Sequence, residues 1–465
     1  MKPRRDTLAV CVAAFGALAV SILLTHATGE GDATLHFLNA REAVADDWAV
    51  VLTSWARPLF KAFIIGPAWA GMTWARLFIA ALSALLVGQT IGIARDLKLD
   101  RPLLAGFFLL APPFAFFAAQ DVLSEVPTAL MTYGALRLWL HGRHALSCVL
   151  VSLIPAVRPE GYFFIALWAA LVVLQARRVV LLPLLGLGVA GWMLVCWAKT
   201  GEPTYPFMSF WPAGGLGFGH GHWWDYLARW PWFMGSALFP IFAVGFFTGW
   251  RRELTLVWLL WWLVLGLHSV LWWRGLFASA GLLRIMVTVA PSTALLSLVG
   301  FNTLADRFAP RSRLVFTVVT MTAAVLTTGQ RFLHDLDHQQ EKLAWPAAEF
   351  IAREHLLAAD TPFFAGNPLV LVALDYPKTK FVRLHLNSEQ KSAALRDLPP
   401  GAIGVWDNGP SSAWLGVTIE DLPALGYEQL AEFSETVEIS NPWHMYQPWR
   451  APDERHLRAV VVRKR

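Results

Sequence analysis

The chain has 465 residues, of which 56% are hydrophobic and only 15% are charged, and it contains 24 Trp and 30 Phe. A soluble core of this length does not bury so much apolar surface, so the composition excludes an ordinary soluble protein and indicates a membrane protein. The net charge of +5 is spread over short basic groups between apolar runs, which excludes a continuous nucleic-acid-binding face. The three cysteines lie in apolar runs without C-x-x-C spacing, so they indicate neither a disulfide framework nor a zinc site.

Apolar runs occupy most of the chain before residue 330. A bilayer-spanning helix needs roughly 20 mostly apolar residues, because the hydrocarbon layer is about 30 Å thick. This criterion predicts about 11 transmembrane helices. They are residues 7–24, 74–94, 103–119, 122–140, 145–157, 161–176, 179–198, 230–249, 254–273, 282–300 and 314–328.

Three of these assignments have alternatives. The fifth and sixth runs, 145–157 and 161–176, are short, and a single re-entrant hairpin is the alternative there. The first run, 7–24, also has the features of a cleaved signal peptide, which would leave the other spans in place. Residues 66–72 are apolar too, and we expect them to form an interfacial segment leading into the second span.

The distribution of Lys and Arg predicts the orientation of the helices. With a cytoplasmic N terminus, fifteen Lys and Arg residues fall at cytoplasmic ends, and nine fall on the outer side over much longer loops. The positive-inside rule therefore places the region after residue 330 outside the cell membrane. We expect labelling to find Ala33, Gly219 and Asp360 outside, and Leu99 and Ala309 inside.

The first outer segment interrupts the apolar sequence with five carboxylates. The stretch EGDATLHFLNAREAVADDW carries Glu30, Asp32, Glu42, Asp46 and Asp47. Ten of the fifteen carboxylates before residue 330 fall on the predicted outer side. Acidic residues contribute little to topology, so this clustering indicates a site that faces outward, with a solvated loop surface as the competing interpretation.

Two further outer motifs place charges at the ends of predicted helices. QDVLSEVP carries Asp121 and Glu125 four residues apart, which is one helical face if a helix begins there. VRPEGYFF carries Arg158 and Glu160 in a tight turn between two apolar segments. Charged groups are costly at such a position unless they are paired or used.

The last outer motifs combine histidine, acidic and basic residues. GFGHGHWWDYLARW holds His220, His222 and Asp225 in a glycine-rich stretch. His-x-His invites a metal interpretation, but no clear third ligand accompanies it, so a divalent metal stays an open alternative. WWRGLFASAGLLRIMV holds Arg274 and Arg284. Arg284 lies two residues inside an apolar span, which suggests an anion ligand, with snorkelling to the headgroups as the alternative.

The composition changes near residue 330. Residues 331–465 are more polar, with Pro and Gly between the strand-like runs PFFAG, AIGVW and AVVVRK and a helical pattern in WPAAEFIAREHLL. This pattern predicts a soluble extracytoplasmic α/β domain. It contains no phosphate loop, nucleophile elbow or metal motif, so a structural or acceptor-guiding role is the expectation.

In this order, the stretches resemble the GT-C superfamily of polytopic glycosyltransferases, particularly bacterial relatives of protein mannosyltransferases and lipid A aminoarabinose transferases. The resemblance covers the membrane part of the chain. It rests on GDATLHFLNA, DDW and RPLF after one span, SEVP before a later helix, RPEG between short spans, and SAGLLR before the penultimate helix. It implies a GT-C-like α-helical polytopic domain over residues 1–330, with outer loops at 26–73 and 199–229, followed by the α/β domain 331–465.

The resemblance implies an inverting glycosyltransferase that uses a polyprenyl-phosphate sugar and a hydroxyl acceptor on a glycan, lipid or protein. The reaction would take place on the outer face of the bacterial cytoplasmic membrane. In such families an Asp of the first outer loop is the general base, which corresponds to Asp32. Many relatives have Asp-Glu at this point where this chain has GDA, so Asp46 and Asp47 remain candidates for the role.

The other candidate residues divide into two groups. The arginine and lysine groups would stabilise the departing phosphate. The predicted phosphate-binding residues are Arg57, Lys61, Arg158 and Arg284. The predicted substrate-binding residues are Asp121, Glu125, Glu160, His220, His222, Asp225 and Arg274.

Other functional classes remain open at this point. A lipid-linked-glycan ligase would share the donor and a large outer loop, but the acidic segment comes early here. A glycolipid transporter or flippase would place charges near the membrane midplane and often shows an internal repeat, which the sequence lacks. A non-enzymatic scaffold would not explain the outward clustering of Asp and Arg. A donor activated by a lipid phosphate requires no nucleotide, which agrees with the missing nucleotide motifs.

Overall fold

The computed structural model divides the chain into two compact units. It describes residues 5–25, 31–45, 48–53, 55–208, 220–276, 279, 281–337, 340–358, 360–376, 393–409, 411–412, 416–439 and 453–465. Unit 1 comprises Met1–His26 and Asp47–Phe332, and unit 2 comprises Ala27–Asp46 and Leu333–Arg465. Unit 1 is helical, whereas unit 2 contains the only sheet in the described parts of the chain.

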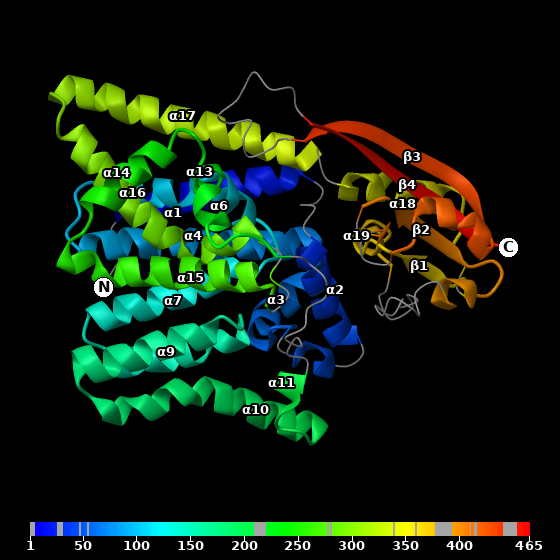
Figure 1. The fold of residues 1–465 in the computed structure, drawn as a ribbon, viewed down its shortest axis with the longest axis horizontal. Helices are drawn as coiled ribbons and strands as arrows, with labels where there is room; N and C mark the ends of the chain where they lie inside the picture. The colour runs from blue at the N-terminus through cyan, green and yellow to red at the C-terminus, as the bar shows by residue number, and fades with distance from the viewer. Residues whose placement is uncertain are drawn as a thin grey trace. The chain divides into compact units, whose positions relative to one another are not determined.

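Unit 1 is a bundle in which α1, α4, α7, α9, α10 and α15 lie side by side with roughly aligned axes (Figure 1). Short 3-10 and π helices, labelled η, extend or connect these helices. The elements are α1 (Arg5–Leu24), η1 (Trp48–Val51), α3 (Pro58–Ala70), α4 (Met72–Asp96), α5 (Leu104–Leu110), α6 (Pro113–Ala118), α7 (Glu125–Leu140), α8 (His144–Ser152), η2 (Ile154–Ala156), α9 (Gly161–Leu171), η3 (Val172–Ala176), η4 (Val179–Gly186), α10 (Leu187–Thr200), α11 (Tyr205–Met208), α12 (Asp225–Ala228), α13 (Trp230–Met234), α14 (Phe239–Thr248), η5 (Arg252–Leu254), α15 (Thr255–Arg274), η6 (Leu283–Val289), α16 (Ala290–Ala305) and α17 (Pro310–Asp337).

All eleven predicted apolar runs are helical, but they are not equally long. Within the described residues, six helices are long and apolar enough to cross a membrane. The remaining five runs are shorter or broken. The third run breaks between α5 and α6, where Pro112 and Pro113 lack the N–H groups that would continue the helix. The eighth breaks at Gly235, whose φ of 77° lies in the left-handed region. The polytopic fold is therefore confirmed, and the number of spans stays a prediction.

Helices α14 and α16 approach each other through two glycines. A Cβ atom at Gly245 would come within 1.8 Å of the Leu296 carbonyl oxygen, and one at Gly300 would come within 2.0 Å of the Ile241 carbonyl oxygen. Small residues allow helix backbones to approach closely in this way. By contrast, a Cβ atom at Gly266 of α15 would meet nothing within 4 Å.

We expect Gly300→Leu to destabilise the protein and Gly266→Leu to leave its stability nearly unchanged. Overpacking a tight contact typically costs about 1–3 kcal/mol, and here the opposing atoms belong to backbone that cannot move aside easily. The thermal midpoint of the detergent-purified protein, followed by tryptophan fluorescence, measures the effect. Equal midpoints for the two variants would contradict the close approach of α14 and α16.

The described part of the first outer segment, predicted as an outer loop over residues 26–73, is largely helical, and its place outside the membrane stays a prediction. It forms α2 (Gly31–Ala45), η1 and α3. Ala33, Phe37 and Ala40 are buried at helical spacing, a periodicity that the acidic residues obscured in the sequence. Residues 27–46 also belong to the same compact unit as the C-terminal region, which differs from the predicted division at residue 330.

Unit 2 is built on a four-stranded sheet with the order β1-β2-β4-β3. Strands β1 and β2 are parallel, and the other neighbouring pairs are antiparallel. The elements are α2, η7 (Gln340–Leu343), α18 (Ala344–Arg353), β1 (Phe363–Ala365), α19 (Leu369–Ala373), β2 (Ile403–Asp407), η9 (Ile419–Asp421), η10 (Pro423–Leu425), β3 (Tyr427–Ile439) and β4 (Asp453–Lys464). The α/β character predicted for this region is confirmed, although β3 was not anticipated.

Both faces of the sheet are covered. Along β4, Val460 and Val462 pack into one apolar cluster with Trp406, whereas Leu457 and Ala459 pack into another with Leu343. Successive side chains of a strand point to opposite faces, so this alternation buries both sides of β4. Helix α2 contacts α19, and Arg41 Nη1 lies 2.8 Å from Asp375 Oδ1.

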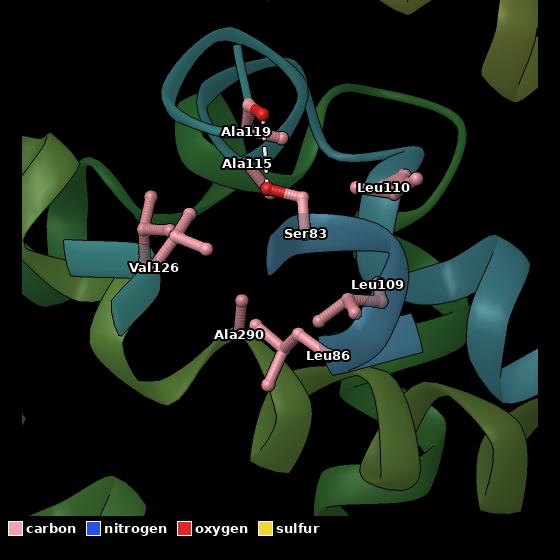
Figure 2. A pocket seen from close by; sticks show the side chains of 9 residues that line it. Ser83, Leu86, Leu109, Leu110, Ala115, Ala119, Val126 and Ala290 are labelled. Carbon is pink, nitrogen blue, oxygen red and sulfur yellow. Dashed lines mark hydrogen bonds between the residues drawn. The ribbon is translucent and has the colours of Figure 1, made fainter. Parts of the chain in front are cut away.

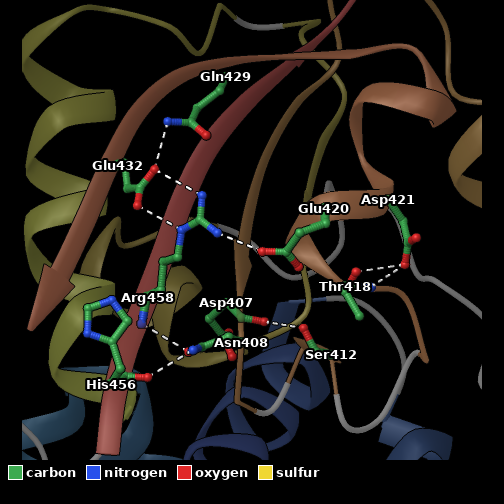
Figure 3. A network of polar contacts seen from close by, with 10 residues as sticks. All are labelled: Asp407, Asn408, Ser412, Thr418, Glu420, Asp421, Gln429, Glu432, His456 and Arg458. Carbon is green, nitrogen blue, oxygen red and sulfur yellow. Dashed lines mark hydrogen bonds and ion pairs between the residues drawn. The ribbon is translucent and has the colours of Figure 1, made fainter. Parts of the chain in front are cut away.

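Polar contacts tie the turn after β2 to β3 and β4 (Figure 3). Arg458 of β4 donates to Glu432 on β3 and to Glu420 in η9. Asn408 bonds with the backbone of His456 and Arg458. Asp407 is buried and accepts from the Gly409 N–H and the Ser411 hydroxyl, while burial raises the pKa of its carboxyl group. All these groups are satisfied by local partners, so the network is structural.

Candidate functional site

A buried ion-pair group forms where the RPEG turn meets the start of α7. Arg158 Nη1 lies 2.8 Å from Glu125 Oε1, and Arg158 Nη2 lies 2.7 Å from Glu160 Oε1. The Arg158 Nε also donates to Glu160 Oε2, so the Arg158–Glu160 pair is bidentate. Arg158 and Glu125 are 4% and 1% exposed, which makes these buried ion pairs rather than headgroup contacts. The snorkelling alternative therefore does not apply to Arg158.

The local backbone explains how two charges fit into one turn. The Arg158 N–H donates to Ile154 O, and the Gly161 N–H donates to Arg158 O. A Cβ atom at Gly161 would lie 2.4 Å from Pro155 N, so this position needs glycine. Burial alone would lower the pKa of Arg158, but the carboxylates of Glu125 and Glu160 raise it above its ordinary value. Burial alone would raise the pKa of Glu160, but Arg158 and then His268 hold it well below its usual range.

Other segments bring two more arginines and a histidine to the same carboxylates. Arg57 Nη1 donates to Ser124 Oγ at 2.5 Å, and Arg158 Nη1 lies 3.3 Å from the same oxygen. Arg284 Nε lies 3.8 Å from Glu125 Oε1. His268 Nε2 lies 3.5 Å from Glu160 Oε1. We call this set the arginine cluster: Arg57, Ser124, Glu125, Arg158, Glu160, His268 and Arg284.

The cluster is assembled from the ends of several helices. Arg57 is the N-cap of α3, Ser124 and Glu125 begin α7, and Glu160 precedes α9. Arg284 lies in η6. Arg57 has φ 62° and ψ 72°, a left-handed conformation that is rare for a non-glycine residue and is further disfavoured before Pro58. Such strain persists where the surrounding structure requires the conformation, and it is common at functional sites.

Five predicted site residues meet in this cluster. They are the phosphate-binding candidates Arg57, Arg158 and Arg284 and the substrate-binding candidates Glu125 and Glu160. Lys61 is fully buried one turn after the start of α3, with its Nζ 5.6 Å from the Phe60 ring centroid. Arg274 is exposed and stacks on Trp273, with 4.4 Å between the guanidinium carbon and the ring centroid.

The predicted residues of the 220–225 segment make local contacts instead. The Trp272 Nε1–H donates to Asp225 Oδ2 at 2.7 Å, and the His222 N–H donates to the same oxygen at 2.8 Å. His222 also stacks on Trp224. Asp225 thus fastens this segment to α15, while His220 and His222 are exposed. Within the described ranges, no group of three His, Cys, Asp or Glu side chains could hold a metal ion.

Asp121 lies near a different arginine. It faces Arg76 of α4, a fully buried residue that the sequence analysis did not select. Asp121 also accepts a hydrogen bond from the Val122 N–H. Asp121 thus interacts electrostatically with an arginine outside the arginine cluster.

The candidate bases fall in and beside α2. Asp32 is in the first turn of α2 and is half-buried. A carboxylate in the first turn interacts favourably with the positive end of the helix dipole. Asp46 and Asp47 lie outside the described residues. The roles of all three residues remain predictions.

Two members of the arginine cluster were missed in the sequence. His268 lies within an apolar span, and an ionisable residue there is a functional candidate by default, so this signal was available. Ser124 carries no such signal, because a serine before an acidic residue is commonly a helix cap. Its hydroxyl instead lies between two arginines.

Comparison with known proteins identifies the fold. Neither a protein-family model nor a curated protein sequence matches the chain. ArnT from Cupriavidus metallidurans in the apo state matches with a TM-score of 0.64 and 13% identity, over 97% of this chain and 97% of ArnT. ArnT from the same organism bound to undecaprenyl phosphate matches with a TM-score of 0.61 and 14% identity, over 98% of this chain and 97% of ArnT. The chain therefore has a fold similar to that of ArnT over nearly its whole length, which confirms the predicted α-helical polytopic fold.

Proposed function

We propose that the protein is a membrane glycosyltransferase that moves a sugar from a polyprenyl-phosphate donor to a hydroxyl acceptor on the outer face of the bacterial cytoplasmic membrane. The arginine cluster is the observation that carries this proposal. Three guanidinium groups from separate segments gather around the buried carboxylate of Glu125 and the partly buried carboxylate of Glu160 at the ends of apolar helices. A matching fold in a protein that was solved with undecaprenyl phosphate supports a lipid-phosphate ligand.

Within this proposal, the three arginines have different roles. Arg158 is held by Glu125 and Glu160, so it organises the cluster. Arg57 and Arg284 approach from α3 and η6, where a guanidinium fork can bind two phosphate oxygens at once. As the bond between the anomeric carbon and the phosphate oxygen breaks, negative charge grows on the phosphate. Fixed cations near that oxygen lower the barrier by stabilising this charge.

The same proposal assigns the proton transfer to Asp32. A carboxylate can accept the proton of the acceptor hydroxyl while the hydroxyl oxygen attacks the anomeric carbon from the face opposite the phosphate. This attack inverts the anomeric configuration. The assignment is supported by the resemblance of the GDATLHFLNA stretch and by the position of Asp32 in the first turn of α2. Mass spectrometry of lipid extracts identifies the sugar and the acceptor.

Lipid analysis and a reconstituted reaction test the proposal. Cells lacking the protein should accumulate a polyprenyl-phosphate sugar and an under-glycosylated acceptor, both visible by mass spectrometry of lipid extracts. The purified protein in lipid nanodiscs should then consume that donor and release polyprenyl phosphate. Translocation of the donor across a liposome membrane without any turnover would instead favour the flippase alternative.

We expect Arg284→Ala to weaken undecaprenyl phosphate binding about 10- to 100-fold, since a hydrogen bond to a charged group contributes about 1.5–3 kcal/mol. Arg284→Lys should restore only part of this affinity, because it lacks the planar fork. Arg353→Ala removes an exposed arginine of α18 and serves as the matched control. Equal affinity in all three variants would leave Arg284 with a purely structural role.

A further inference from the structure

Arg76 is a buried arginine that donates hydrogen bonds to two chain segments, those at Thr25 and Gln120. It lies in the first turn of α4 and is 1% exposed. Its Nη1 donates to the Thr25 carbonyl oxygen at 2.8 Å, and its Nη2 donates to Thr25 Oγ1 at 2.8 Å. Its Nε donates to the Gln120 carbonyl oxygen at 3.1 Å. One side chain therefore satisfies backbone acceptors in two segments that are nearly a hundred residues apart.

Both acceptors follow the end of a helix. Thr25 comes directly after α1, and Gln120 comes two residues after α6. The last carbonyl groups of a helix have no partner within the helix, and a cation there also interacts favourably with the helix dipole. Asp121, the residue after Gln120, faces the same guanidinium group. Arg76 thus places its positive charge beside these carbonyl groups where α1, α4 and α6 meet.

Apolar packing beneath Arg76 holds the same three helices together. Leu18 and Ile22 of α1 pack with Ala80 of α4 and with Ala119. Ser83 of α4 donates to the Ala119 carbonyl oxygen beside a small apolar pocket (Figure 2). That pocket has room for about one water molecule, so it does not hold a lipid chain. This packing holds α1, α4 and α6 together, and Arg76 holds the chain where it leaves α1 and α6.

We propose that Arg76 is a positioning residue that sets where the turn after α6 presents Ser124 and Glu125. The inference rests on the proposed function of those residues. Ser124 follows Gln120 by four residues. A misplacement of about 1 Å can cost about 10²-fold in rate. Arg76 therefore acts on turnover through the residues that follow the Gln120 carbonyl group it holds.

The chain supplies a matched control at the opposite end of the same helix pair. Arg95 lies in the last turn of α4, where Nη2 donates to Asp6 Oδ2 at 2.9 Å and Nη1 donates to Thr7 Oγ1 at 2.5 Å. Arg76 and Arg95 thus fasten the two ends of α1 to α4. Loss of either weakens the same pairing of helices, but only Arg76 also holds the turn that leads to Ser124 and Glu125.

The experiment compares Arg76→Lys and Arg76→Gln with Arg95→Lys and Arg95→Gln in the full-length protein. We expect kcat to fall about 10²-fold in Arg76→Gln and less in Arg76→Lys, which retains one donor group. Undecaprenyl phosphate should also bind more weakly to Arg76→Gln, because the displaced turn carries Ser124 of the arginine cluster. The Arg95 variants should keep near-normal kcat even if their thermal midpoints fall equally. Equal loss of kcat in the two pairs of variants would overturn the inference.

A distance measurement separates this inference from the proposed function. Spin labels at Phe117 on α6, which is partly exposed, and at the exposed Leu146 on α8 are placed in a background without Cys11, Cys148 and Cys196. The distance distribution should broaden in Arg76→Gln and stay unchanged in Arg95→Gln. This readout needs no turnover, so it applies even if no polyprenyl-phosphate sugar is consumed. An unchanged distribution in Arg76→Gln would contradict the positioning role.

Discussion

Asp32→Asn should lower turnover of the polyprenyl-phosphate sugar by about 10²- to 10⁴-fold, the range that a positioned general base contributes. Asparagine keeps the shape of the side chain and removes its capacity to accept a proton at neutral pH. Expression and undecaprenyl phosphate affinity should stay at the level of the unchanged protein, because the substitution removes no cation from the arginine cluster. Single-turnover kinetics with the purified donor measure the effect on the chemical step directly.

The control variants separate a lost base from a disturbed helix. Asp375→Asn breaks the exposed ion pair between Asp375, which follows α19, and Arg41 of α2, so it loosens the surroundings of α2 without altering Asp32. Such a surface pair contributes at most about 1 kcal/mol, and we expect turnover to stay within about twofold. Asp46→Asn and Asp47→Asn should be milder than Asp32→Asn. An inactive Asp46→Asn or Asp47→Asn variant, together with an active Asp32→Asn variant, would assign the general base to Asp46 or Asp47. Full activity in all three would refute the acidic segment as the source of the base.

Arg158→Ala should destabilise the whole protein rather than only weaken donor binding. The structure shows that Arg158 is the shared partner of Glu125 and Glu160, so its loss leaves the buried carboxylate of Glu125 and the partly buried one of Glu160 without their main counter-charge. Breaking a buried ion pair from one side typically costs about 3–5 kcal/mol. Burial with two glutamates thus gives Arg158 a structural role that its sequence context did not reveal. Thermal inactivation rates in detergent measure the loss.

A compensated variant distinguishes stability from function at the same position. Replacing Arg158 with Met and both Glu125 and Glu160 with Gln removes the cation and the two anions together. Neutral replacement of a buried ionic group is often tolerated, so most of the stability should return. Activity should not return, because the group that organises Arg57 and Arg284 is gone. If Arg158→Ala itself were as stable as the unchanged protein, water would have to solvate Glu125 and Glu160 in place of Arg158. The proposal that the arginine cluster uses buried charges would then be wrong.

Much of the site was accessible from the sequence because charged residues are rare near apolar helices. Arg158 and Glu160 stand out in the RPEG turn for this reason, and Arg57 and Arg284 stand out beside apolar runs. The structure brings these four residues together with Glu125. His268 and Arg76 obey the same rule, because each is an ionisable residue in an apolar helix, although neither is among the predicted site residues.

Other parts of the site were not accessible from spacing alone. Asp121 and Glu125 are four residues apart, yet only Glu125 belongs to α7, since that helix begins there. Asp121 precedes the helix and faces Arg76 instead. His220, His222 and Asp225 suggested a ligand site, but Asp225 is used to fasten its segment to Trp272. A hydrogen bond to a tryptophan 47 residues away leaves no trace in local sequence.

The membrane class of the protein follows from its sequence, because bilayer thickness and the need to pair every backbone group restrict an apolar chain to helices of a given length. The α/β character of the C-terminal region also follows from short apolar, β-branched runs such as AVVVRK. The pairing of each arginine with its carboxylate, and the place of α2 (Gly31–Ala45) in the same unit as the sheet, became visible in the tertiary structure alone. The physical reason is that hydrophobic periodicity is a local property of the chain, whereas ion pairs and helix-end contacts join groups far apart in sequence.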